Sequence, residues 1–144
     1  MKSTPVFFHV ERNDEFHEAG VPIPFDHAFL NTGEAMDLNR GIFTATRAGT
    51  YFFSAAGIVN FPAGSTSSLG TFEIYICLNE DKITFDNMRG ELLDTEWTSQ
   101  FSLHALLELH PDDQISLRIP YLKQTYLSSV TYFIGWMLEE KRAN

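Results

Sequence analysis

The chain has 144 residues, of which 44% are hydrophobic and 14% aromatic, and it carries a formal net charge of −9. This length suits one domain with a core of its own, and the acidic balance argues against nucleic acid as a partner, because acidic surfaces repel phosphate. A single cysteine, Cys77, excludes an intrachain disulfide, and the absence of any run of about 18 apolar residues predicts no membrane span.

The first half of the chain alternates short apolar runs with turn residues. Turn residues occur at 20–24, 31–33, 39–41 and 48–49, and such regular punctuation is typical of a β-sandwich or barrel. The run 51–56 is apolar on both faces except at Ser54. One face can enter a core, and we expect a second copy of the chain to cover the other. The Gly, Pro and Ser residues of the segment 61–70 predict a mobile loop there.

The second half shows a clearer period of two. Apolar residues alternate over 72–78, 101–109 and 115–119, which places them on one face of each expected strand. The segment 101–110 also permits a helix, because Leu, Ala and Glu are good helix formers. Residues 130–138 are apolar on both faces. No helical crossover separates these runs, so the fold class predicted is all-β.

Five motifs in order resemble the signature of the complement C1q globular domain family. They are Phe25-Asp26 with Asn31-Thr32-Gly33, then Gly41-Ile42-Phe43 with Gly49-Thr50-Tyr51-Phe52-Phe53, then 76–79, 107–117 and 131–138. The resemblance covers about residues 5–138 of a single domain, 1–144, whose residues 139–144 form a polar C-terminal tail. It implies a ten-stranded, two-sheet jelly roll of the C1q and tumour necrosis factor type, which is trimeric and secreted. One departure is Asp112, where the family has Gly, so this turn either differs or accepts a left-handed Asp.

The double-sided apolar runs give the candidate subunit contacts of a homotrimer. Tyr51 and Phe53 share a strand face, as core residues or subunit-contact residues would. The predicted trimer interface consists of Phe7, Tyr51, Phe53, Tyr132, Phe133 and Trp136.

Calcium is the one metal that the resemblance suggests, since some C1q-type trimers hold it near their apex. Asp94 and Glu96 lie in the corresponding segment and carry the oxygen ligands that calcium takes. The position that aligns with a family ligand is Ser99, so a plain acidic loop is the alternative. The five histidines lack zinc-site spacing, and no other cofactor is expected.

Aromatic residues beside polar ones provide candidate ligand contacts. Trp97, Tyr121, Lys123 and Tyr126 suit contact with a sugar or a protein, although packing against a neighbouring strand explains them equally well. No Gly-x-Ser-x-Gly motif occurs, and the histidine cluster of a cupin-like enzyme is missing, so catalysis is not expected.

The function predicted is therefore that of a secreted, trimeric recognition protein of innate-immune or lectin character. Its expected partners are a protein receptor or a glycan on a microbial surface. The alternative is a signalling ligand, like tumour necrosis factor or the adipokine-type relatives, that clusters a receptor.

Overall fold

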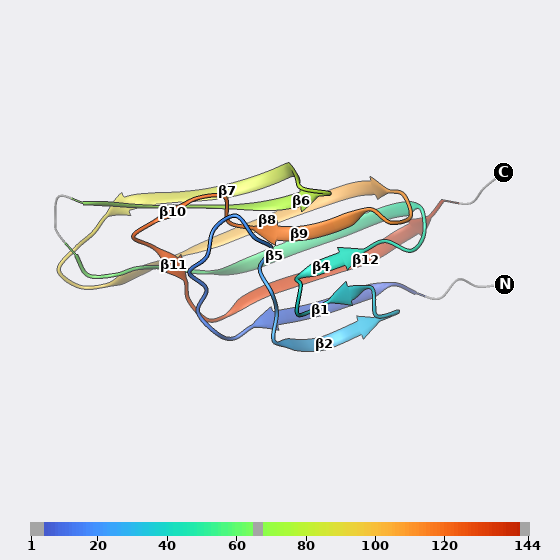
Figure 1. Cartoon of the computed structure of the whole chain (residues 1–144), viewed down its shortest axis with the longest axis horizontal. Helices are drawn as coiled ribbons and strands as arrows, with labels where there is room; N and C mark the ends of the chain where they lie inside the picture. Colours follow the sequence, from blue (N-terminus) through green and yellow to red (C-terminus); the bar gives the residue numbers. More distant parts are fainter. Residues whose placement is uncertain (1–4, 65–67, 142–144) are drawn as a thin grey trace.

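The protein is a two-layer β-sandwich. The computed structural model describes residues 5–64 and 68–141, in which twelve strands form two six-stranded antiparallel sheets (Figure 1). Sheet I contains, in spatial order, β8 (Trp97–Leu109), β5 (Gly49–Phe61), β12 (Thr131–Glu140), β1 (Phe7–Arg12) and β2 (His27–Thr32), with β11 (Tyr126–Leu127) also beside β5. Sheet II contains β7 (Asp81–Glu91), β6 (Leu69–Leu78), β9 (Gln114–Arg118), β4 (Ile42–Thr44) and β3 (Met36–Asp37), with β10 (Leu122–Lys123) also beside β6.

This architecture confirms the all-β jelly-roll fold class. The count exceeds the expected ten strands because two-residue segments such as β10 and β11 also pair with longer neighbours. No helix in the described residues is long and apolar enough to cross a membrane.

Within the segment 101–110, residues 101–109 are strand, and the helical alternative is wrong. β8 pairs with β5 over its full length, from Trp97 opposite Phe61 to Leu109 opposite Gly49. Leu103 is buried while His104 and Leu106 are exposed, which is the alternation of a strand and not the spacing of a helix. Tertiary pairing therefore overrides the helix propensity of the segment.

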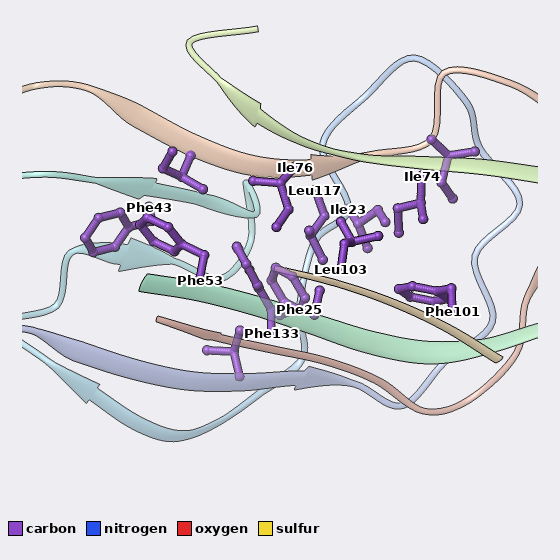
Figure 2. Close-up of a cluster of buried hydrophobic side chains, with 14 of the residues drawn as sticks. Ile23, Phe25, Phe43, Phe53, Ile74, Ile76, Phe101, Leu103, Leu117 and Phe133 are labelled. Atoms are coloured by element: carbon purple, nitrogen blue, oxygen red, sulfur yellow. The ribbon is translucent and has the colours of Figure 1, made fainter. Parts of the chain in front are cut away.

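Aromatic side chains from both sheets meet in the core (Figure 2). The ring of Phe43 from sheet II lies 5.5 Å from that of Phe53 in sheet I, and Phe8 lies 5.1 Å from Phe133. Gly135 leaves the room that the Phe8 and Phe53 rings occupy, because a Cβ there would meet each ring at 2.6 Å. The apolar positions of one face of each sheet thus fill the sandwich.

Two turns at one end of the sandwich are joined by hydrogen bonds. The side chain of Asn79, after β6, donates to Asp113, before β9, and accepts from the backbone N–H of Gln114. Asp113 also accepts from the backbone N–H of His110, and these bonds to its carboxylate lower the pKa of Asp113. Asp112 beside it has a φ of 75°, so the turn keeps the left-handed residue that the family places there as Gly.

The two predicted non-strand segments are shorter than expected. Phe61 belongs to β5 and Leu69 to β6, while residues 65–67 of the predicted loop lie outside the described residues. β12 continues to Glu140, so the expected polar tail begins as strand, and its last residues, 142–144, are also outside the description.

Candidate functional site

The outer face of sheet I is apolar and aromatic although no other layer formed by residues 5–64 and 68–141 covers it. Leu106 is 61% exposed, Phe29 52% and Trp136 37%. Charged residues are few among the outward positions of its central strands, which carry Phe52, Ser54, Ala56 and Ile58 on β5 and Tyr132, Ile134 and Trp136 on β12. A soluble domain rarely leaves so large an apolar surface open, so this face is a candidate interface.

Contacts between neighbouring rings hold the aromatic side chains of this face in place. Phe52 and Trp136 have ring centroids 4.8 Å apart, and His9 packs 4.6 Å from Phe29. Between β1 and β12 lies a groove of about 410 Å³, lined among others by Phe7 and Trp136. Rings held by neighbours lose little side-chain freedom on association, which suits them to contact a partner.

The six residues predicted for the trimer interface divide into two groups. Phe7, Tyr132 and Trp136 lie on the outer face of sheet I, where a second chain can reach them. The assignment of Tyr51, Phe53 and Phe133 is corrected, because each is 0% exposed within one chain and packs in the sandwich core. A side chain with no exposed surface has nothing to offer another subunit, and the core alternative explains these three.

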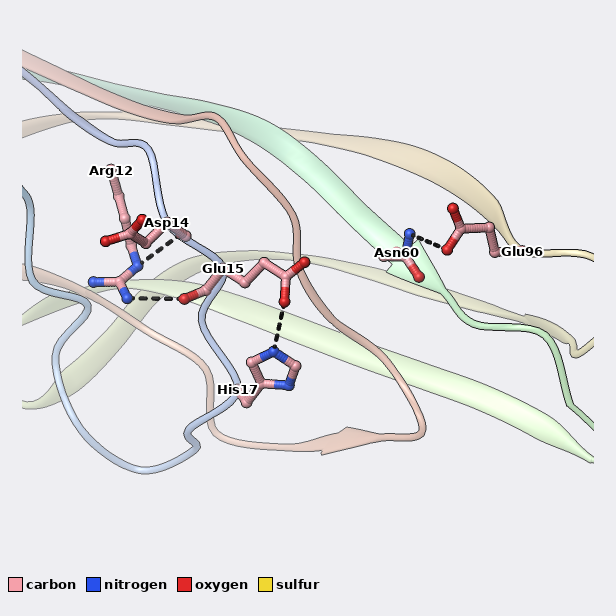
Figure 3. A network of polar contacts seen from close by, with 6 residues as sticks. All are labelled: Arg12, Asp14, Glu15, His17, Asn60 and Glu96. Carbon is pink, nitrogen blue, oxygen red and sulfur yellow. Dashed lines mark hydrogen bonds and ion pairs between the residues drawn. The ribbon is translucent and has the colours of Figure 1, made fainter.

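A polar cluster lies at the end of sheet I where β5 ends and β8 begins (Figure 3). The Asn60 amide donates to Glu96 at 3.3 Å, and Glu15 contacts the His17 ring at 3.2 Å. The Tyr126 ring stacks on His17 with centroids 4.4 Å apart. Burial, and then the Glu15 and Glu96 carboxylates, raise the pKa of Tyr126.

The predicted calcium ligands do not form a complete site in one chain. Asp94 and Glu96 are both exposed, and Glu96 already accepts a bond from Asn60. Within residues 5–64 and 68–141, no group of three or more His, Cys, Asp or Glu side chains is placed to hold a metal ion. Calcium takes about six to eight oxygen ligands, so these two carboxylates do not fit it by themselves, and calcium binding stays a prediction.

The four predicted ligand residues do not come together. Trp97 points inward, stacking on Phe61 at 3.9 Å and donating to the carbonyl of Glu91. Tyr126 belongs to the polar cluster of sheet I. Tyr121 and Lys123 lie on the other sheet, where β10 pairs with β6. Packing therefore accounts for Trp97, and only Tyr121 and Lys123 share a surface.

That surface also holds residues that the sequence reading missed. Phe85 and Arg89 project outward from β7, and Arg118 lies opposite Tyr75. Exposed and less exposed residues alternate along 81–91, but Ile83 and Phe85 are exposed while Thr84 and Asp86 are less exposed, so the hydropathy of the sequence does not indicate which face of this strand meets solvent. Spacing in the sequence gave no sign that this strand would adjoin Lys123.

The comparison with protein families is decisive. The model of the C1q domain matches residues 7–138, nearly the whole chain. The chain belongs to the C1q domain family. Members of this family are generally recognition or structural proteins without catalytic activity.

Two individual similarities agree with this membership. The chain is 30% identical over 125 residues to the collagen alpha-1(X) chain of Mus musculus, covering 87% of this chain but 17% of that relative's length. Its fold is similar to that of the globular domain of zebrafish complement 1qA protein, with a TM-score of 0.71 at 15% identity, over 94% of this chain and 99% of that one. The second similarity shows the fold alone.

Proposed function

We propose that this C1q domain is a secreted, non-enzymatic recognition module that works as a homotrimer, with innate-immune or lectin-like ligands. The observation that carries the proposal is the apolar outer face of sheet I. Three copies packed through this face would remove its exposed rings from water, while the other sheet of each copy stays free to bind.

The chemistry of the two faces supports this division. Burying Leu106, Trp136 and their neighbours is favourable at about 25 cal/mol per Å² of apolar surface. The free side of sheet II carries Arg89, Arg118 and Lys123 beside exposed rings such as Phe85, a mixture that suits a ligand more than a second subunit. Extracellular action is proposed from the family and from the collagen relative, since a collagen chain works outside cells.

The test is the mass of the purified chain in solution by size-exclusion chromatography with light scattering. The mass of three chains at micromolar concentration is the expected result. A stable monomer, or a dimer at all concentrations, contradicts the proposal.

Ligand class then separates the proposed role from a receptor-clustering signal. A glycan array and a pull-down against cell-surface receptors use the same trimer. Saturable glycan binding supports the lectin-like role, whereas capture of one receptor with no glycan signal favours a ligand of the tumour necrosis factor type.

A further inference from the structure

Three adjacent rows of side chains run across neighbouring strands on the outer face of sheet II, beside a fourth row formed by Leu69 and Glu91. Residues opposite one another in an antiparallel pair share a face, so the register places each row on the same surface. The rows are Arg89, Thr71 and Lys123; Asn87 and Glu73; and Phe85, Tyr75 and Arg118.

Positive charge is concentrated on this face. Lys82, Arg89, Arg118 and Lys123 are four of the ten Lys and Arg residues of a chain whose net charge is −9. The carboxylate within the three rows is that of Glu73, which accepts a hydrogen bond from the Tyr75 hydroxyl at 3.2 Å, and Glu91 in the fourth row is a second carboxylate on this face. A local cationic surface on an acidic protein favours a small anionic group over a long polyanion, which the rest of the protein would repel.

Aromatic rings lie among these cations. The Lys82 ammonium is 4.7 Å from the ring centre of Phe85 and 5.2 Å from that of Tyr75. Tyr121 is 51% exposed and borders a pocket of about 250 Å³ on the same face. Flat exposed rings offer a surface against which the apolar side of a sugar ring can pack.

Several polar groups around the pocket have unused hydrogen-bonding capacity within the described residues. Glu73, Asn87 and Arg89 line it with Tyr121, and the Asn87 and Arg89 side chains make no hydrogen bond to the described residues. The Thr71 hydroxyl, which also borders the pocket, is buried without a partner. A site with an amide, a carboxylate and a guanidinium beside a phenol can bind several hydroxyl groups and one acid group at once.

We propose that this pocket binds an anionic saccharide, a sugar ring that carries a carboxylate or a sulfate. The Tyr121 ring packs against the apolar side of the sugar, and Asn87 and Glu73 bind its hydroxyl groups. Arg89 pairs with the acid group through two parallel N–H donors, a geometry that Lys cannot reproduce. Lys123 adds charge from the opposite side of Thr71. This inference rests on the proposed recognition function and names its ligand class.

The experiment is isothermal titration calorimetry of the full chain with four defined probes. These are 3′-sialyllactose, 3′-sulfolactose, lactose and inorganic phosphate. Binding of at least one acidic sugar, at least tenfold tighter than lactose and phosphate, is expected. The sialylated and sulfated probes tell a carboxylate from a sulfate, and phosphate tests for an anion site without sugar contacts.

Two variants and a matched control locate the site. Arg89→Ala and Tyr121→Ala are each expected to weaken binding of the acidic sugar at least tenfold. Arg40→Ala removes an exposed arginine from the turn between β3 and β4, and binding should not change. Arg89→Lys should recover only part of the affinity.

Several results would overturn the inference. They are no binding of either acidic sugar, lactose or phosphate binding equally well, or an equal loss in Arg40→Ala. Each variant is also run on the light-scattering column. If the chain is a trimer but binds no acidic sugar, the saccharide site is wrong and the proposed trimer stands. If the chain is a monomer that binds the acidic sugar, the proposed trimer is wrong and the saccharide site stands.

Discussion

The two outer faces of the sandwich differ in chemistry although both are built from antiparallel strands. The outer face of sheet I presents Phe52, Trp136 and Leu106, with rings that pack on one another. The outer face of sheet II presents Arg89, Arg118 and Lys123 around Tyr75 and Tyr121. Both sheets send apolar residues into the core, so the contrast between them lies in the outward positions. Outward positions of a strand are free of core constraints and are where a sandwich acquires its binding properties.

The largest expected effect comes from loosening the core that holds both faces in place. Phe133→Ala removes a ring that is 0% exposed and contacts Phe8, Phe25 and Phe53. We expect the free energy of unfolding to fall by about 3–5 kcal/mol, measured by urea denaturation. Phe85→Ala, an exposed ring on sheet II, is the control and should change it by less than about 1 kcal/mol. Similar losses for the two variants would contradict this division between core and surface.

A charge placed on each face in turn sharpens the comparison. Trp136→Lys puts an ammonium into the apolar face of sheet I, and burying it unpaired in a subunit contact costs several kcal/mol. Light scattering should show the trimer replaced by monomers with the circular dichroism spectrum of folded β-sheet. Phe85→Lys places the same charge on sheet II, and the mass measured by light scattering should remain that of three chains. If Phe85→Lys dissociates the assembly and Trp136→Lys does not, the faces have been assigned the wrong way round.

The smallest effect concerns the turns beside sheet II. Asp113→Asn keeps the shape of the side chain but removes the charge that strengthens its bonds to Asn79 and His110, and should cost about 1 kcal/mol. The lowered pKa of Asp113 means that this stability is present above the pKa of the unfolded chain, about 3.9, and is lost as the pH falls through the folded value. Melting temperatures of the two proteins should therefore differ at pH 7 and converge below about pH 4. A constant difference over this range would show that the charge of Asp113 does not contribute.

The fold was predictable because its signal is carried by local patterns and by ordered family motifs. The sequence run at Tyr51, Phe52 and Phe53 shows why the interface was only half predictable. All three are aromatic, so the alternation that separates inside from outside gives no contrast, and the register alone directs Phe52 outward. The three wrong interface residues are all inward neighbours of outward ones.

The surface of sheet II was harder to foresee for a different reason. Arg89 is about 30 residues from Arg118 and Lys123 in the sequence, and the three share one face only because β6 pairs with β7, β9 and β10. Such a constellation depends on non-local pairing, which single-residue patterns do not encode. Tyr121 and Lys123 lie two residues apart, so the mixture of aromatic and polar residues in that segment was visible in the sequence, and their binding role stays a prediction.

The placement of the two faces on opposite sides of one thin sandwich has a consequence for valency. If sheet I faces a threefold axis, the pocket on each sheet II points away from it, and three equivalent sites look outward in different directions. A flat array of sugars can then meet only some of them at once, whereas branched chains or several neighbouring strands can occupy more. Multivalent binding would therefore be stronger for ligands that surround the assembly than for ligands arranged on a flat surface.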